Sequence, residues 1–328
     1  ARSTPAATPS FRLHLPSADQ LGTAVPGRSR FSPTRLRDYL ACPFRYYLKH
    51  CLGMESVSPM GEEMDALLFG VITHRVLMEL GKPELREETD PAVLRARLLQ
   101  AWERVVEQQF GPSPPALVAL QTDAAAERLG RAADEQARLV ADGWRISAME
   151  RRVSGFPLGN GKSLSGIIDR IDQRPQTGEW LIIDYKTADS GKKPAETHYR
   201  TPGKDDLPEY RHVEIPGGRN PLKRVWQDLQ LPLYQLALRP RIGDAKVTCA
   251  YFNLPRNEKN AGLQPLGLTP ELNHSALVCA AGAVEDILRR RFWPPSDVRY
   301  DDFERLFPFP IEDCLQPERH FSEEGILL

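Results

Sequence analysis

Three ionisable side chains lie at the ends of two apolar stretches near the middle of this 328-residue chain. Residues 165–172 contain Asp169, and residues 180–187 contain Asp184 and Lys186. Ionised groups on buried strands are costly unless they are paired or bound to a metal ion. If the two stretches pair, two carboxylates and one ammonium meet, as in a divalent-cation site that hydrolyses phosphodiesters. A salt-bridged hairpin without chemistry is the alternative, and these residues alone leave both interpretations open.

The two stretches predict a β-hairpin. Both are rich in Ile, and residues 173–178 between them include a proline and a glycine. Because side chains alternate along a strand, Asp184 and Lys186 would project from one face and Tyr185 from the other. The run that begins at Glu150 predicts a further strand, so we expect a three-stranded meander.

Helical periodicity predicts that helices flank this meander. Apolar residues recur at helical spacing in most of the remaining chain, which predicts helices over residues 32–48 (interrupted at Pro43), 62–81, 91–110, 123–147, 222–238 and 270–292, with one more strand over 246–253. We therefore expect a mixed α/β (α+β) fold with a central mixed β-sheet flanked by helices. The helical layer at about residues 84–148 is interpreted as a cap or insertion beside the sheet.

Two of the predicted helices carry polar residues whose role the local sequence leaves open. His74 follows Gly70 by one helical turn on the same side. A glycine inside a helix costs up to ~1 kcal/mol relative to alanine, so it indicates close approach of backbone or ligand. A lone helical histidine is more often structural than a metal ligand, although imidazole is a common ligand. Gln230 and Tyr234 are four residues apart and so share one face of the predicted helix. They are either incidental polar groups of an amphipathic core helix or a polar ridge that faces the site.

Composition limits the class of protein. The net charge is −1, so any nucleic-acid binding must come from local patches. No apolar run approaches the roughly 20 residues that span a membrane, and no secretory signal is visible at the start of the sequence. The five cysteines are odd in number and widely spaced, which favours a reducing, cytoplasmic location over a disulfide framework.

Two segments are predicted to lack regular structure. Residues 1–30 are rich in Pro, Ser, Thr and Ala and are typical of a flexible arm or linker. The chain begins with Ala1 rather than Met, so we expect that it is processed or cut from a longer protein. Residues 188–222 are typical of a long polar loop directly after the candidate site, and its basic residues could contact phosphates.

Four short motifs occur in order on a predicted helix, strand, strand and helix: Gly70-x-x-x-His74, Gly166-x-x-Asp169, Asp184-x-Lys186 and Gln230-x-x-x-Tyr234. With the segment Tyr39-Leu-Ala-Cys-Pro-Phe-Arg-Tyr-Tyr-Leu48, they make the chain resemble the PD-(D/E)XK nuclease superfamily, and within it the AddB/RecB-type nuclease domain, over about residues 31–310. The resemblance implies a restriction-endonuclease-like core in a single nuclease domain over residues 31–328, with the helical layer as an insertion.

The resemblance also implies roles for individual residues. Mg²⁺ or Mn²⁺ would be held by His74, Asp169, Asp184 and the carbonyl of Tyr185, since hard divalent ions take oxygen ligands. Lys186 would orient the attacking water or stabilise the transition state. Gln230 and Tyr234 would contact DNA or support the site. Candidate DNA contacts are Arg170, Lys192, Lys193, Lys223 and Trp226.

These roles predict a metal-dependent DNA nuclease, an exonuclease on single-stranded ends in recombination and double-strand-break repair. DNA would be one partner, and the other would be a helicase, either as a domain or as a separate chain. A non-catalytic DNA-binding or scaffold module of a helicase–nuclease complex is the alternative, and a nuclease of the CRISPR-adaptation type is a third interpretation.

One departure from the resemblance concerns cysteines. AddB-type relatives often carry an iron–sulfur cluster held by four cysteines, and Cys42 stands where the first would be. The other three positions are Val298, Asp301 and Phe307, and Cys314 lies outside the pattern. A cluster requires thiolates, so we expect no iron–sulfur cluster. We expect instead that ordinary packing fixes the tail to the first helix through Val298, Tyr300, Phe303 and Phe307.

Overall fold

The computed structural model describes residues 29–55, 63–203, 207–217, 219–296 and 303. The predicted arm over residues 1–30 therefore lies outside the described residues, apart from its last two. Among the described helices, none is both long and apolar enough to cross a membrane.

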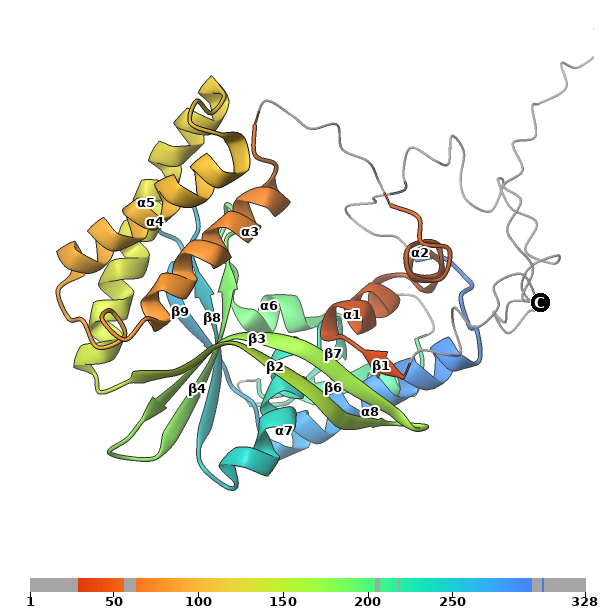
Figure 1. Ribbon diagram of the computed structural model, residues 1–328. Coiled ribbons are helices and arrows are strands. Elements are labelled where there is room, and N and C mark those ends of the chain that lie inside the picture. The colour runs from red at the N-terminus through yellow and green to blue at the C-terminus, as the bar shows by residue number, and fades with distance from the viewer. Residues whose placement is uncertain (1–28, 56–62, 204–206, 218, 297–302, 304–328) are drawn as a thin grey trace, which may run out of the picture.

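A mixed β-sheet forms the centre of the molecule (Figure 1). Its main path runs β1-β3-β4-β8-β9, and β2 pairs with β3. The strands are β1 (Arg30–Phe31), β2 (Arg145–Gly159), β3 (Lys162–Arg174), β4 (Glu179–Lys186), β8 (Val247–Asn253) and β9 (Gly262–Leu266). The antiparallel pairs β2–β3 and β3–β4 form the predicted meander, whereas β4 and β8 are parallel. β2 begins five residues before the predicted start at Glu150.

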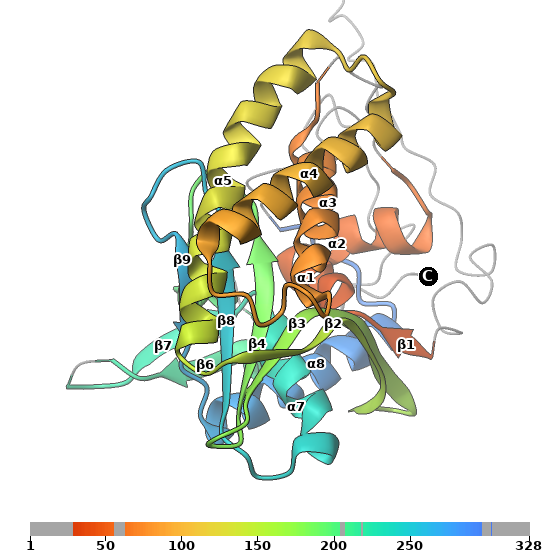
Figure 2. The same cartoon turned by 60° about the vertical axis from the view of Figure 1, so that its left-hand side comes forward.

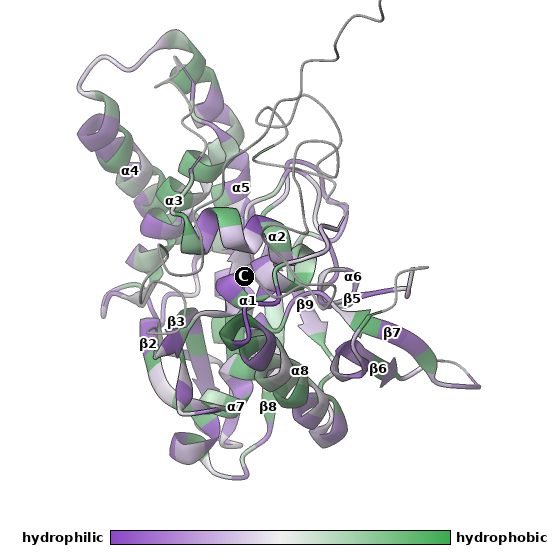
Figure 3. Cartoon of the chain, turned by 90° about the vertical axis from the view of Figure 1, so that its right-hand side faces the viewer, coloured by the Kyte–Doolittle hydropathy of each residue, from purple (hydrophilic) through white to green (hydrophobic). Residues whose placement is uncertain are grey.

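Helices cover both faces of this sheet (Figures 1 and 2). One core cluster joins the sheet to α3 (Ala66–Leu77), α4 (Pro91–Phe110) and α5 (Ala116–Ala141). The other joins it to α1 (Pro33–Ala41), α2 (Pro43–Tyr46), α7 (Gln230–Ile242) and α8 (Pro270–Leu288). In Figure 3 the helices α3, α4 and α5 carry both hydrophobic and hydrophilic residues, as expected of helices with one face on a core. The predicted fold class, a mixed sheet flanked by helices, is confirmed.

Strand β4 shows why the sequence needs helices on both sides. Leu181, Ile183 and Tyr185 belong to the core on the α3–α5 side, while Ile182 belongs to the core on the α7 side. A strand buried on both faces has a continuous apolar sequence, and residues 181–183 supply one. By the same alternation, Asp184 and Lys186 lie on the α7 side and the Tyr185 ring lies on the other, as predicted.

The region after β4 is more ordered than the sequence predicted. Residues 188–222 contain α6 (Pro194–His198) and contribute β5 (Tyr199–Arg200) and β6 (His212–Ile215) to a small sheet of order β5-β7-β6. β7 is Leu222–Trp226, so the prediction of a helix from residue 222 is wrong for its first part, and α7 begins only at Gln230. Pairing of β7 with β5 and β6 and burial of Val225 and Trp226 override the helical spacing.

The first helical region begins as predicted. The Ser32 hydroxyl accepts the N–H of Arg35 at 3.2 Å, Pro33 opens α1, and a break at Cys42 precedes Pro43, which opens α2. Of the four tail residues expected to pack here, only Phe303 is described, and it is buried in the same core. The positions 298, 300, 301, 307 and 314 lie outside the described residues, so the expectation about an iron–sulfur cluster stays a prediction.

Candidate active site

The strand register brings the two candidate acids together. Arg170 on β3 pairs with Ile183 on β4, which places Asp169 opposite Asp184. The Tyr185 N–H donates to Asp169 Oδ2 at 2.9 Å. The side chain of Asp169 is 13% exposed and Asp184 is 4% exposed. Two carboxylates therefore sit side by side with little solvent to separate their charges.

Lys186 supplies the positive charge of the site. Its Nζ lies 2.6 Å from Asp184 Oδ2, donates to Gln230 Oε1 at 3.3 Å and lies 4.6 Å from the centre of the Tyr251 ring. Burial acts to lower the pKa of Lys186, but Asp184 and Tyr251 outweigh it and raise the pKa above its ordinary value. Lys186 is therefore an ammonium, a hydrogen-bond donor rather than a base.

His74 on α3 reaches the same corner. Its Nε2 is 3.1 Å from the carbonyl oxygen of Tyr185, and its Nδ1 is 3.6 Å from Asp169 Oδ2. Burial lowers the pKa of His74, so the neutral imidazole that can bind a metal ion is favoured. Burial, and after it the charge of Asp184, raises the pKa of Asp169 to about 8. An acid that resists ionisation in this way gains from a nearby cation.

Two glycines of the motifs permit close approach at the site. A Cβ on Gly70 would lie 3.1 Å from Thr187 Oγ1, just beyond the end of β4. A Cβ on Gly166 would lie 2.9 Å from the hydroxyl oxygen and from Cε1 of Tyr234. Because glycine has no side chain, α3 can lie close to the end of β4 at Gly70. In the same way, Tyr234 of α7 can pack against β3 at Gly166.

Gln230 and Tyr234 lie on the side of the sheet that carries Asp184 and Lys186. Asp228 Oδ1 accepts the N–H of Gln230 at 2.8 Å, which holds the start of α7. Burial raises the pKa of Tyr234 to about 12, and its hydroxyl stays protonated. The Gln230 side chain therefore supports Lys186 directly, whereas Tyr234 fills the space above Gly166.

Two of the candidate DNA contacts are buried and do not face solvent. Arg170 is 1% exposed, and its Nε and Nη2 donate to the two carboxylate oxygens of Asp172 at 2.7 and 2.6 Å. Trp226 is fully buried, and its Nε1 donates to Ser275 Oγ at 3.0 Å. Burial is inconsistent with direct DNA contact by either residue, which corrects that expectation. Three candidates are exposed and remain available: Lys192, Lys193 and Lys223.

The structure adds Glu150, which the sequence analysis placed on a strand but not in the site. One ligand atom from each of His74, Glu150 and Asp169 can be chosen so that all three lie within 4.8 Å of one another. Pairing the strand that contains Glu150 with the Gly166–Asp169 motif would have indicated this position, but the strand register was not predictable from sequence alone.

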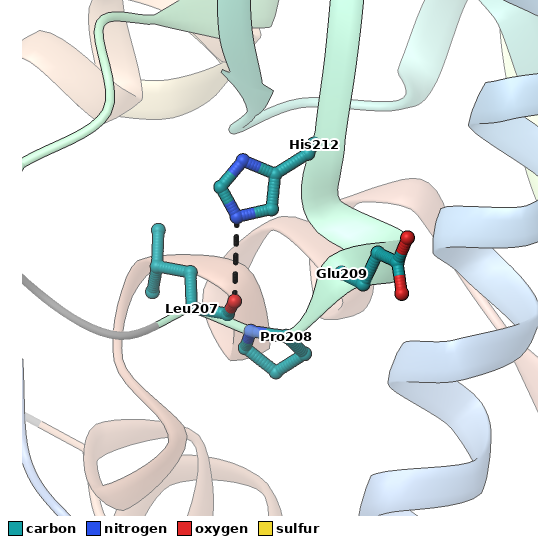
Figure 4. Close-up of a pocket in the computed structure, with 4 residues that line it drawn as sticks. All are labelled: Leu207, Pro208, Glu209 and His212. Carbon is teal, nitrogen blue, oxygen red and sulfur yellow. Dashed lines mark hydrogen bonds between the residues drawn. The ribbon is translucent and has the colours of Figure 1, made fainter.

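A cavity of about 960 Å³ opens beside Lys186. The end of β4 lines it with Tyr185, Lys186 and Thr187, and α3 and α5 line it with Leu67, Phe69, Leu117 and Leu120. Arg128 and Arg256 contribute positive charge, and Glu63 and Asp189 negative charge. A second pocket is lined by Leu207, Pro208, Glu209 and His212, with His212 Nε2 3.3 Å from the Leu207 carbonyl oxygen (Figure 4). No candidate site residue lines that second pocket.

Comparison with known proteins identifies the class of protein. The model of the PD-(D/E)XK nuclease superfamily matches residues 30–300, and the chain belongs to this superfamily. A curated relative is one of the subunits of the ATP-dependent helicase/deoxyribonuclease of Caldanaerobacter subterraneus subsp. tengcongensis, 29% identical over 184 residues. That match covers 48% of this chain and 15% of the relative, so the chain spans a small part of the relative's length.

A solved structure is similar to this chain over most of both lengths. It is a protein named provisionally as an exonuclease, from Eubacterium rectale, with a TM-score of 0.48 and 16% identity. The alignment covers 92% of this chain and 98% of that one.

The donor atoms of this corner suit the divalent ions that nucleases of this superfamily use. Carboxylate oxygens of Asp169 and Asp184, the Tyr185 carbonyl oxygen and an imidazole nitrogen of His74 are available there. Hard ions such as Mg²⁺ prefer oxygen, and Mn²⁺ takes oxygen and also accepts imidazole nitrogen. The residues present therefore fit a divalent ion.

Proposed function

We propose that this chain is a Mg²⁺- or Mn²⁺-dependent deoxyribonuclease that degrades single-stranded DNA ends as an exonuclease in recombination and double-strand-break repair. The observation that carries the proposal is the convergence of Asp169, within β3, with Asp184 and Lys186 at the end of the paired strand β4. Residues 31–328 would form one nuclease domain with the helices at about 84–148 as an insertion.

The chain's own residues divide the work of phosphodiester hydrolysis. When bound, the ion would activate the attacking water and offset the negative charge that develops on the phosphate. Asp169, Asp184, His74 and the Tyr185 carbonyl would hold it. Lys186, kept charged by Asp184 and oriented by Gln230, would donate to the developing charge. His74 would stay neutral to act as a ligand rather than an acid.

The cavity beside Lys186 offers a path for the substrate strand. Leu67, Leu117 and Leu120 are 78%, 44% and 66% exposed, an unusual concentration of apolar side chains at a polar site. The bases of single-stranded DNA are unpaired, and their apolar faces can pack against such side chains. In a duplex these faces are stacked inside the double helix and are not accessible. This supports single-stranded over double-stranded DNA as the substrate.

A helicase is the proposed partner. The matched relative is named as part of an ATP-dependent helicase/deoxyribonuclease. Strand separation by a helicase would supply the single-stranded end that the cavity would take.

Digestion of labelled single-stranded DNA by the purified chain tests the proposal. We expect shortening of the DNA with Mn²⁺ or Mg²⁺ and none with a chelator. Asp184→Asn and Lys186→Ala should each lower the cleavage rate by about 10²–10³-fold or more, since each removes charge that stabilises the transition state. The matched controls Asp244→Asn and Lys259→Ala change exposed side chains outside the site and should cleave at the wild-type rate. Binding of DNA without metal-dependent cleavage would instead indicate the scaffold alternative.

A further inference from the structure

One arginine of the cavity beside Lys186 has no partner within the described part of the protein. Three cationic side chains line the cavity: Lys186, Arg128 and Arg256. Lys186 pairs with Asp184, and Arg128 pairs with Asp189 at 2.6 Å. The exposed side chain of Arg256 makes no hydrogen bond or ion pair with any described residue. Arg256 is therefore the cation of this wall that is available to a negatively charged ligand.

The backbone that carries Arg256 is held in place beside the end of β4. The parallel pairing of β4 with β8 continues into the loops that follow them (Figure 2), because the Leu254 N–H donates to the Lys186 carbonyl at 2.7 Å and the Arg256 N–H donates to the Asp189 carbonyl at 3.1 Å. The Asn253 side chain ties the two loops together by donating to one carbonyl of each, at 2.8 and 2.9 Å. A fixed backbone avoids the cost of ordering a loop on binding.

The apolar and the cationic side chains lie on different walls of the cavity. Leu67 is on α3 and Leu120 is on α5, whereas Arg256 is in the loop between β8 and β9. Glu63, which precedes α3, also lines the cavity and forms no ion pair with Arg256. Its charge would repel phosphates from the helical wall. A single strand of DNA has a matching division, because its bases offer apolar faces and its backbone carries the negative charge.

We propose that single-stranded DNA lies in the cavity with its bases against α3 and α5 and its backbone against the loop after β8, and that Arg256 binds one of its phosphates. This inference rests on the proposed nuclease function. A guanidinium suits the contact, because its planar N–H groups match the oxygens of a phosphate. Arg128 is not available for it, since its side chain is only 6% exposed and donates to Asp189 and to the Thr187 carbonyl. Arg256 thus sets the orientation of the bound strand.

Binding of single-stranded DNA at several salt concentrations, followed by fluorescence anisotropy with a chelator present, tests the role of Arg256. Arg256→Gln should weaken binding about tenfold or more, as expected for loss of a charge-assisted hydrogen bond. The slope of log affinity against log salt should fall in magnitude by about 0.7, the value for one phosphate contact on a single strand. Arg256→Lys keeps the charge and should retain the wild-type slope. The control Arg241→Gln changes an exposed arginine in the last turn of α7, outside the cavity, and should bind as the wild type.

An abasic strand separates the phosphate contact from contacts with bases. Such a strand keeps its phosphates and lacks its bases, so Arg256→Gln should weaken its binding by the same factor as for the intact strand. Leu67→Ser with Leu120→Ser should weaken binding of the intact strand only, because the abasic strand has no bases for the leucines to contact. All three side chains are exposed, so each variant should melt at the wild-type temperature.

The outcomes separate this inference from the proposed function. Equal affinity in the wild type and Arg256→Gln overturns the inference, and metal-dependent cleavage by the same wild-type protein leaves the nuclease proposal intact. A loss that disappears with the abasic strand shows that Arg256 contacts a base, and it also overturns the inference. An equal loss in Arg241→Gln shows a general effect of net charge, with the same consequence. A wild-type chain that binds no single-stranded DNA overturns both the inference and the proposed function.

Discussion

At the scale of single residues, the same short sequence segments contain both structural and candidate catalytic charges. Asp169 and Asp172 are three residues apart on β3, yet Asp172 is fully buried and forms a two-point ion pair with Arg170. The ordinary salt-bridge interpretation thus applies to Arg170 and Asp172. Asp184 and Lys186 also form an ion pair, but the Lys186 side chain is 31% exposed and lines a cavity. Access to a ligand distinguishes the two pairs.

The buried pair gives a stability prediction. Arg170→Met leaves the Asp172 carboxylate buried without its partner and should lower the free energy of unfolding by about 3–5 kcal/mol. The double variant Arg170→Met/Asp172→Leu removes both charges and should cost clearly less than the single variant. Denaturant unfolding of the wild type, both single variants and the double variant measures the coupling. Additive costs would contradict the structural role assigned to this pair.

Candidate site residues that lie within one helix or one strand could be selected from the sequence, because helical and strand spacing shows which side chains share a face. It could not predict contacts that depend on long-range pairing. Arg170 and Trp226 looked like surface candidates, but the packing of β3 and β7 buries both. Glu150 enters the site only through the β2–β3 register. The two motif glycines were recognised, but what each one approaches, Thr187 and Tyr234, emerged only from the fold.

At the scale of elements, α6 and α7 are joined by a neutral histidine. His198 Nδ1 lies 2.9 Å from the Pro194 carbonyl oxygen and donates to it, and His198 Nε2 accepts the N–H of Leu231 at 3.4 Å. Burial lowers the pKa of His198 despite the nearby acids Asp228 and Asp184. Protonation would remove the acceptor that holds the first turn of α7, next to Gln230.

This linkage predicts acid sensitivity. In the unfolded chain a histidine has a pKa of about 6.5, whereas folded His198 takes up its proton only at lower pH. At pH values between the folded and unfolded pKa of His198, the chain therefore takes up a proton when it unfolds. The contribution of His198 is fully present above about pH 6.5 and is lost as the pH falls, by at most about 1.4 kcal/mol per pH unit.

His198→Gln offers a donor and an acceptor without titration, so it isolates this contribution. We expect the free energy of unfolding to fall less steeply from pH 7.5 to 5.5 in this variant than in the wild type. Chemical denaturation at a series of pH values measures both slopes. Parallel pH profiles would show that His198 contributes nothing to acid sensitivity.

At the scale of the whole molecule, residues of α3 and α5 and the end of β4 line the cavity beside Lys186. Arg128 of α5 holds these parts together, because it donates to the Thr187 carbonyl at 2.7 Å and pairs with Asp189 at 2.6 Å. Its guanidinium also lies 4.8 Å from the centre of the Phe69 ring on α3. The helical layer is therefore fixed against the strand end that carries Lys186, and it forms one wall of the proposed strand path.

The cavity wall gives a binding prediction. Leu67→Ser with Leu120→Ser should weaken single-stranded DNA binding about tenfold or more, since each change removes about 1 kcal/mol of apolar contact. Stability should change little, because both leucines are exposed. Fluorescence anisotropy with a chelator present measures binding without cleavage. Val93→Ser on α4, exposed outside the cavity, is the control. Equal affinity in all three proteins would contradict this path.

The central claim is that Asp169 and Asp184 share one divalent ion beside Lys186. Crystals soaked in Mn²⁺ and measured for anomalous scattering test it most directly. We expect one strong peak at ligand distance from both carboxylates, with Lys186 adjacent. A corner that stays empty at saturating Mn²⁺, with the two carboxylates turned away from each other, would contradict it.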